Sequence, residues 1–165
     1  RCRAFGMRVL YYQRHRDPES ERSLGIHYTP LDTLLRESDS ISLHVPLTDE
    51  TRGLINRPRL EAMKSTAFLI NQARGKVVDE EALVWALREG KINGYATDVY
   101  AQEPPDPAGE LFRFKRVVAA PHLGGGTREA RLRANMTVVG EVLRIIRGEL
   151  PQNLVNKEVL ERTGR

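Results

Sequence analysis

Residues 67–79 read AFLINQARGKVVD, a short apolar run that ends in polar residues and a glycine. A run of this length, Ala67–Asn71, is typical of a strand buried in a parallel sheet. Asp79 then places acidic side chains in the first turn of an amphipathic stretch that reaches Arg88 and that Gly90 ends. The segment therefore predicts one strand, a polar loop and one helix, in that order.

The same alternation of apolar runs and amphipathic stretches extends in both directions along the chain. Four further runs read as strands: Met7–Tyr12, Ser40–Val45, Gly94–Val99 and Val117–Ala120. Helical stretches are expected to start at Pro30 and to run from Thr127 to Ile146. Apolar residues recur at helical spacing in the longer stretch and are expected to face the core: Leu132, Met136, Val139, Leu143 and Ile146. Five strands with helices between them predict an α/β fold, a doubly wound parallel sheet with helices on both faces.

The N-terminal segment departs from this regular order. Arg1–Phe5 followed by Gly6 is typical of the last turn of a helix and its glycine cap. No G-x-G-x-x-G motif is present, and the glycines at 124–126 have the wrong spacing for one. In a Rossmann-like sheet with strand order 3-2-1-4-5-6, the first strand is central. We therefore expect a Rossmann-like chain that lacks its first strand and its glycine-rich turn.

Composition excludes several classes of protein. The 165 residues suit one domain, and 40% hydrophobic with 29% charged residues is ordinary globular composition. A net charge of +4, from 26 basic and 22 acidic residues, is small for a nucleic-acid binder. No apolar run approaches the ~20 residues that span a bilayer. The single cysteine, Cys2, excludes an internal disulfide and a cysteine-based zinc cluster, so we expect a cytoplasmic protein without a metal.

Polar side chains follow three successive apolar runs. Arg74 comes after the third run, Glu103 after the fourth and His122 after the fifth. Taken singly, these residues could be a surface arginine, a loop acid and a helix cap. Because parallel strands end at one edge of a sheet, where ligands bind in open α/β folds, we expect them to form one site.

On these residues the chain resembles the nucleotide-binding domain of the D-isomer-specific 2-hydroxyacid dehydrogenases. Met63–Asp79 follows the family signature, and Ser38–Ile55 resembles a second one, with Ser40 where an apolar residue is usual. The resemblance covers residues 1–156, expected to be a partial NAD(P)-binding domain, with 157–165 a tail toward a substrate domain. It implies hydride transfer between a nicotinamide cofactor and a small 2-oxo or 2-hydroxy acid, as in glyoxylate or hydroxypyruvate reductases. A homodimer is implied as well.

The resemblance also implies a role for each of the three residues. His122 is the general acid that protonates the carbonyl oxygen, since imidazole titrates near neutral pH. Glu103 orients the imidazole ring and favours its protonated form. Arg74 clamps the substrate, because a guanidinium fork binds a carboxylate through two hydrogen bonds.

Cofactor contacts are implied along the same edge. Asp98 and the backbone at Gly124 meet the nicotinamide carboxamide, the main chain of Asn71–Ala73 lines the nicotinamide, and His44–Pro46 covers the adenosine end. The cofactor-binding residues implied in this way are His44, Val45, Pro46, Thr51, Asn71, Ala73, Arg74, Asp98, His122 and Gly124. Two of these residues have an alternative, purely structural role. His44 could hydrogen-bond to the backbone at the end of a strand, and Thr51 could cap a helix.

The end of the first predicted strand bears on the choice of cofactor. Dinucleotide-binding folds that use NAD place an acidic residue at this point, where it binds the ribose 2′-hydroxyl. Gln13 stands there instead, followed by Arg14-His15-Arg16. Gln13 and Arg14 therefore predict that NADP is favoured, and the alternative is an exposed basic loop that Asp17 and Glu19 offset.

Two other functional interpretations remain open from the sequence. One is a nucleotide-sensing binding module of the corepressor type, whose peptide cleft would lie in a domain absent from this chain. The other is a fragment that is inactive by itself. The glycine turn and the helix N-terminus that receive a pyrophosphate are absent from residues 1–165.

Overall fold

The computed structural model describes residues 1–158 and 160. By its internal contacts the chain divides into two compact units, Arg1–Pro121 and His122–Arg165. The positions of the two units relative to each other are not determined.

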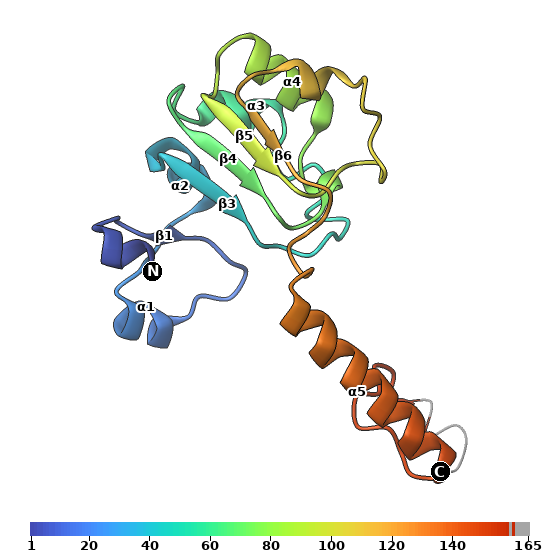
Figure 1. The fold of residues 1–165 in the computed structure, drawn as a ribbon. Helices are drawn as coiled ribbons and strands as arrows, with labels where there is room; N and C mark the ends of the chain where they lie inside the picture. Colours follow the sequence, from blue (N-terminus) through green and yellow to red (C-terminus); the bar gives the residue numbers. More distant parts are fainter. Residues whose placement is uncertain (159, 161–165) are drawn as a thin grey trace. The chain divides into compact units, whose positions relative to one another are not determined.

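The first unit is built on a parallel sheet of four strands (Figure 1). The strands are β3 (Ser40–Leu43), β4 (Phe68–Asn71), β5 (Gly94–Thr97) and β6 (Val117–Ala119), in that spatial order. Their register aligns the last residue of each strand, so that Leu43, Asn71, Thr97 and Ala119 form one row. This row is the carboxyl edge at which the sequence predicts a site.

A separate parallel pair lies nearer the N-terminus. It consists of β1 (Leu10–Tyr11) and β2 (His27–Tyr28). Within the described residues β1 pairs with β2 alone and β3 with β4 alone, so each is an edge strand of its own sheet. All five predicted strands are confirmed, although each is shorter than its apolar run. β2 was not predicted, because two residues beginning with a histidine show neither an apolar run nor alternation.

The helices of the first unit begin at residues whose side chains cap them. The α-helices are α1 (Pro18–Leu24), α2 (Leu31–Glu37), α3 (Arg57–Ala62) and α4 (Glu80–Arg88), and the 3₁₀ turns are η1 (Cys2–Phe5), η2 (Gly75–Val77) and η3 (Glu110–Arg113). The helix predicted after Asp79 is confirmed as α4, and Asp79 is its N-cap, because the Asp79 carboxylate accepts the Ala82 N–H. α2 is the exception, since it begins one residue later than predicted and its cap, Pro30, makes no side-chain hydrogen bond. The helical turn before Gly6 is confirmed as η1, and Gly6 takes the expected left-handed conformation.

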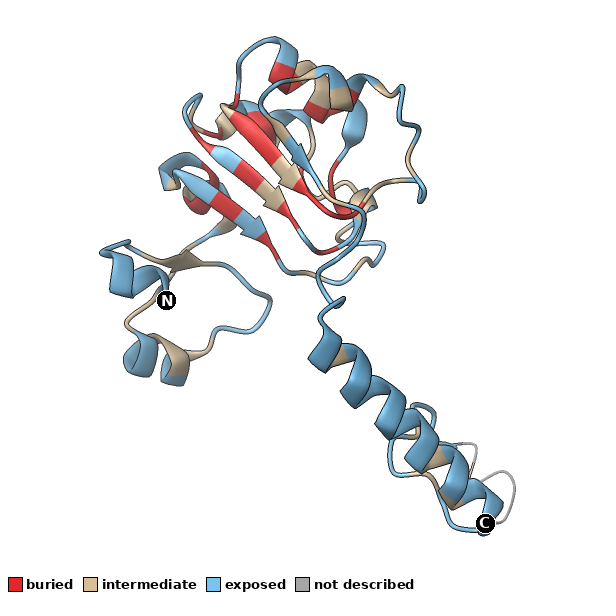
Figure 2. Ribbon diagram, viewed as in Figure 1, coloured by how far each residue is buried: buried red, intermediate tan, exposed pale blue. Residues whose placement is uncertain are grey.

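The core lies between the sheet and one layer of helices, in which α3 contacts both α2 and α4 (Figure 2). The largest fully buried side chains are Leu35, Ile55, Leu60, Leu69, Leu83, Leu87, Ile92, Val77 and Asn71. On the opposite face of the sheet, Ser40, Ser42 and Phe68 are exposed. The predicted Rossmann-like α/β architecture with a parallel sheet is confirmed. Helices were expected on both faces of the sheet, and within the first unit α2–α4 cover one face while Ser40, Ser42 and Phe68 are exposed on the other.

The second unit contains α5 (Arg128–Ile146), the long helix predicted from Thr127 to Ile146, with Thr127 as its N-cap, followed by a returning segment. The Glu141 carboxylate holds that segment, because it accepts hydrogen bonds from Gln152 and Asn153. In the part of the chain that the structure describes, no helix is long and apolar enough to cross a bilayer.

The prediction that the apolar stripe of α5 faces the core is wrong. The five side chains of that stripe, at positions 132, 136, 139, 143 and 146, are between 45% and 75% exposed, and α5 has no buried residue. Helical spacing identifies an apolar face but does not say whether its partner belongs to the same chain.

Candidate active site at the carboxyl edge of the sheet

Asn71 organises the loop that leaves the carboxyl end of β4. Its side chain is fully buried, and its Oδ1 accepts the N–H of Ala73 at 3.1 Å while its Nδ2 donates to the Arg74 carbonyl at 3.0 Å. A buried amide that bonds to both sides of a loop holds that loop in one conformation. The residue expected to line a cofactor therefore also fixes the backbone that carries Arg74.

An open groove lies in front of this loop. It has a volume of about 490 Å³, within the range of small-molecule sites. Six of its lining residues lie in segments predicted for the cofactor or substrate: His44, Val45, Pro46, Gln72, Ala73 and Arg74. Leu47 completes the lining, and it could have been found because it directly follows a predicted segment. The structure thus brings two predicted segments, 44–46 and 72–74, to one groove.

Arg74 is exposed at this groove, although its guanidinium bonds within its own loop. The Nη1 atom donates to the Ala73 carbonyl at 2.7 Å. This contact holds the side chain near the loop backbone. A guanidinium has five N–H donors, so this bond leaves the planar fork able to bind a carboxylate.

His44, expected at the adenosine end of the cofactor, and Thr51, expected near its pyrophosphate, have local partners that differ from the structural alternatives proposed for them. His44 Nε2 lies 2.8 Å from the Ser42 hydroxyl, so its partner is a side chain rather than the backbone. Thr51 Oγ1 donates to the Pro46 carbonyl at 2.6 Å and accepts the Thr48 N–H at 2.8 Å. Thr51 is therefore not a helix cap, since it closes the turn that follows Pro46.

Polar residues at the end of β5 are buried. Thr97 is 5% and Asp98 7% exposed. The Thr97 hydroxyl lies 3.0 Å from the Asn71 carbonyl and accepts the Val99 N–H at 3.1 Å, which ties β5 to the loop after β4. The sequence analysis did not single out Thr97, although its place directly before Asp98 was a signal.

The Glu103 carboxylate is held by its own loop. Its Oε1 accepts the backbone N–H of Tyr100 at 3.1 Å. Gly75, which directly follows Arg74, approaches the same loop closely, because a Cβ at position 75 would lie 1.9 Å from the Tyr100 carbonyl carbon. The structure therefore brings the Arg74 and Glu103 loops into contact.

His122 stands three residues after the end of β6 and is the first residue of the second unit. Its φ is 50°, in the left-handed region that non-glycine residues adopt infrequently. Gly124 belongs to the same unit. Both residues follow the carboxyl end of β6 along the chain. That they line the groove stays a prediction.

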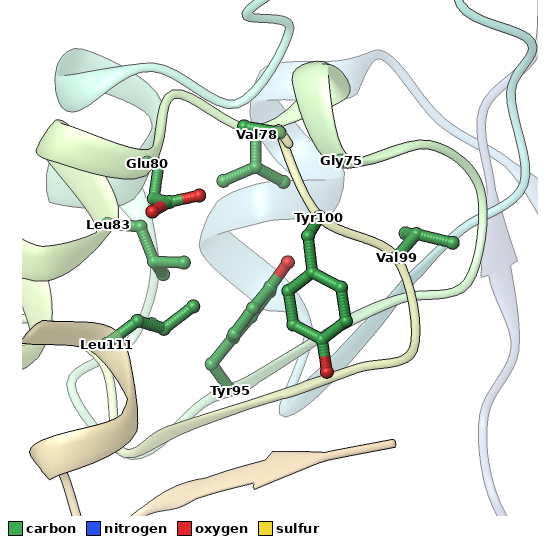
Figure 3. Close-up of a pocket in the computed structure, with 9 residues that line it drawn as sticks. Gly75, Val78, Glu80, Leu83, Tyr95, Val99, Tyr100 and Leu111 are labelled. Atoms are coloured by element: carbon green, nitrogen blue, oxygen red, sulfur yellow. The ribbon is translucent and has the colours of Figure 1, made fainter. Parts of the chain in front are cut away.

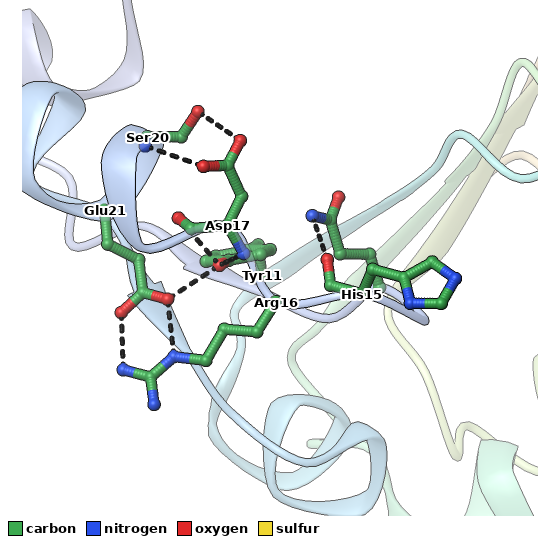
Figure 4. A network of polar contacts seen from close by, with 7 residues as sticks. Tyr11, His15, Arg16, Asp17, Ser20 and Glu21 are labelled. Carbon is green, nitrogen blue, oxygen red and sulfur yellow. Dashed lines mark hydrogen bonds and ion pairs between the residues drawn. The ribbon is translucent and has the colours of Figure 1, made fainter.

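The basic loop after β1 contains two arginines with different partners. Arg16 makes two hydrogen bonds to the Glu21 carboxylate, at 2.7 and 2.8 Å, and the Tyr11 hydroxyl donates to the same carboxylate at 2.8 Å (Figure 4). Arg14 instead forms one exposed ion pair with Glu50 at 2.7 Å. The Gln13 amide donates to the His15 carbonyl. Arg16 is thus held by two hydrogen bonds within the fold. The Arg14–Glu50 ion pair is exposed, and exposed ion pairs contribute little to stability.

Stability should depend on pH through Glu21. Hydrogen bonds from Arg16 lower the pKa of Glu21 from 4.5 to about 2. A lowered folded-state pKa stabilises the fold above the unfolded value, and this contribution is lost as the pH falls from about 4.5 through about 2. We expect Glu21→Gln to lower the urea midpoint at pH 7 and to have a shrinking effect below pH 4.5. Glu19→Gln is the control, because it removes the same charge from the same helix and leaves the Arg16 pair intact. If Glu21→Gln lowered the urea midpoint equally at pH 7 and below pH 4.5, this account would be contradicted.

Among residues 1–158 and 160, no group of three or more histidine, cysteine or acidic side chains could hold a metal ion.

Comparison with known proteins adds evidence of relationship. A family model described as the D-isomer specific 2-hydroxyacid dehydrogenase, NAD binding domain, matches residues 1–124. The chain is 50% identical over 159 residues to a protein of Aeropyrum pernix named glyoxylate reductase, and the match covers 96% of this chain and 48% of that protein. It is 52% identical over 161 residues to a protein of the same name from Thermococcus kodakarensis, with 98% and 48% covered.

Solved structures show the same similarity. The TT0316 protein from Thermus thermophilus superposes with a TM-score of 0.85 at 44% identity, over 92% of this chain and 47% of that chain. An NAD complex of a D-isomer specific 2-hydroxyacid dehydrogenase from Lactobacillus delbrueckii superposes with a TM-score of 0.82 at 33% identity, over 93% and 50%. This chain spans about half the length of each of these relatives.

Proposed function

The chain belongs to the D-isomer specific 2-hydroxyacid dehydrogenase family, and from this premise we propose that the whole protein reduces a small 2-oxo acid with a nicotinamide cofactor. Glyoxylate and hydroxypyruvate are the proposed substrates. The observation that carries the proposal is the groove that unites His44–Pro46 with Ala73 and Arg74. Since the chain spans about half the length of its relatives, the activity is proposed for the whole protein.

The residues of the groove suit a nicotinamide cofactor. The 490 Å³ volume is that of a small-molecule site, and the buried Asn71 amide presents the 71–74 main chain in one conformation. The Asp98 carboxylate, 7% exposed at the end of β5, is suited to accept a hydrogen bond from a carboxamide. When bound, the reduced nicotinamide supplies a hydride to the carbonyl carbon of the substrate.

The chain's own residues then bind the acid and move the proton. Arg74 binds the substrate carboxylate with its guanidinium fork. His122 donates a proton to the carbonyl oxygen, and in the reverse direction it accepts the hydroxyl proton. Glu103 hydrogen-bonds to the imidazole and favours its protonated form.

The proposal extends to the setting in which the protein works. We place it in the cytoplasm as a homodimer that binds neither nucleic acid nor membrane, in line with its single cysteine and its small net charge of +4. The names of the relatives support a reductase over a nucleotide-sensing binding module.

We further propose that NADP is favoured over NAD. A 2′-phosphate carries about 1.5–2 negative charges near neutral pH. Gln13 is neutral, and Arg14 can leave its exposed pair with Glu50 at little cost, whereas Arg16 is held by Glu21. Gln13 with Arg14, rather than the whole basic cluster, is therefore the proposed phosphate-recognising element.

The test of function and cofactor is one assay of the whole protein. Oxidation of NADPH and of NADH is followed with glyoxylate and with hydroxypyruvate, and kcat/KM is compared between the two cofactors. We expect a preference for NADPH that Gln13→Asp reduces by about 10- to 100-fold, because the new carboxylate repels the phosphate. Gln13→Asn is the control, since it keeps a neutral amide. The absence of reduction with either acid refutes the enzymatic function, and a preference for NADH that Gln13→Asp leaves unchanged refutes the cofactor proposal.

A further inference from the structure

Tyr100 contacts the loops that carry Arg74 and Glu103, and it contacts Ala120, which lies two residues before His122. It lies three residues after the end of β5, and it was not among the residues predicted for the site. We infer that Tyr100 is a positioning residue that fixes the Arg74 loop, the Glu103 carboxylate and Ala120, the last held residue before His122, relative to one another. The inference rests on the proposed function for the roles of those three residues and on the contacts of Tyr100 for the coupling.

The first contact joins Tyr100 to the Arg74 loop through backbone alone. A Cβ built on Gly75 would lie 1.9 Å from the Tyr100 carbonyl carbon, 2.0 Å from its oxygen and 2.3 Å from the Ala101 nitrogen. No side chain fits in that space, so the backbone after Arg74 rests directly on the Tyr100–Ala101 peptide. Position 75 requires glycine for this close approach rather than for a special φ.

The second contact joins Tyr100 to Glu103. The Tyr100 N–H donates to the Glu103 Oε1 atom at 3.1 Å. One peptide segment therefore supports the loop after Arg74 on one side and orients the Glu103 carboxylate on the other. Movement of the Tyr100 backbone would displace both groups together.

The third contact reaches the segment that leads to His122. The Tyr100 hydroxyl donates to the Ala120 carbonyl at 2.8 Å, and the Ala120 N–H donates to the Thr97 carbonyl at 3.0 Å. The Ala120 residue is thus held through both its N–H and its carbonyl. Only Pro121 separates it from His122, and a proline ring fixes φ, so few rotatable bonds lie between the held residue and the histidine.

The surroundings of Tyr100 keep its side chain in place. The ring packs against Phe112 with centroids 5.8 Å apart, and Figure 3 shows it beside Tyr95 and below Val78, at a cavity of about 10 Å³. A space of that size holds no more than about one water molecule, so the ring has little room to move. Burial raises the pKa of Tyr100 above its ordinary value of 10.0, so the hydroxyl stays protonated and able to donate at neutral pH.

The decisive variant is Tyr100→Phe in the whole protein, which keeps the ring and removes the bond to Ala120. We expect kcat for reduction of the 2-oxo acid to fall about 10- to 100-fold, because a displacement of about 1 Å at a catalytic group has an effect of this size. The KM for the cofactor should stay within about twofold of the wild-type value, since Tyr100 does not line the groove. Tyr11→Phe is the matched control, because it removes a hydroxyl that also donates at 2.8 Å, to Glu21. It should leave kcat unchanged.

A second measurement makes the inference independent of catalysis. Hydrogen exchange of the Ala120 amide, which bonds to Thr97, should accelerate about tenfold in Tyr100→Phe and stay unchanged in Tyr11→Phe, since loss of one hydrogen bond has about this effect. A wild-type protein that reduces no 2-oxo acid overturns the proposed function. Unchanged exchange at Ala120, or an unchanged kcat in an active protein, overturns the role of Tyr100.

Discussion

Replacement of His122 by alanine is expected to lower kcat for 2-oxo acid reduction by about 10²- to 10⁴-fold, with a much smaller change in the affinity for the cofactor. General acid catalysis usually accelerates a reaction by a factor of this size. Hydride addition to a carbonyl leaves an alkoxide unless a proton arrives, and in the proposed mechanism His122 is its donor. The measurement is kcat and cofactor KM for the wild-type and variant whole proteins.

The backbone at position 122 calls for a second variant. Because φ is 50°, alanine could disturb the local conformation as well as remove the acid. His122→Asn is the matched variant, since asparagine adopts the left-handed region more readily but cannot protonate a carbonyl. We expect both variants to be equally slow. Recovery of activity by asparagine, or an equal loss of turnover and cofactor affinity, would make the histidine structural.

Replacement of Arg74 by lysine is expected to raise the KM for the 2-oxo acid and to lower kcat/KM by about 10- to 100-fold. Lysine keeps the charge but loses the planar fork that makes two hydrogen bonds to a carboxylate. The Asn71 side chain bonds to the Arg74 carbonyl and the Ala73 N–H, so the loop backbone should keep its conformation in the variant. An unchanged KM for the cofactor would indicate that Arg74 acts on the substrate, whereas a raised KM for the cofactor would indicate a general disturbance of the groove.

Arg113→Lys is the control for Arg74→Lys, because Arg113 is an exposed arginine on η3 and does not line the groove. It should leave both KM values unchanged. A wild-type KM for the 2-oxo acid in Arg74→Lys would assign carboxylate binding to another residue.

Local patterns were sufficient for the elements that present the candidate site. The strand at 68–71 and the helix at 80–88 follow from an apolar run, an acidic first turn and a glycine stop, each of which acts over a few neighbouring residues. Arg74 could be predicted for the site from its place after a strand, because parallel strands end at one edge of a sheet, whereas the groove residues 44–46 and 72–73 were implied by the family resemblance. The two-residue strand β2 escaped prediction, since its pairing with β1 rather than its composition defines it.

Contacts between distant residues decided the rest. Arg14 and Arg16 belong to one basic cluster in the sequence. In the folded chain Arg16 hydrogen-bonds to Glu21, whereas Arg14 forms an exposed ion pair with Glu50. The apolar stripe of α5 is evident from its spacing, yet burial depends on what packs against it, and its side chains are exposed. Tyr100 has no distinguishing motif, and its contacts reach Gly75 and Ala120, both far from it in the sequence. Short-range periodicity determines the elements and the residues at their ends, whereas the partners of those residues depend on long-range packing, which only the tertiary structure provides.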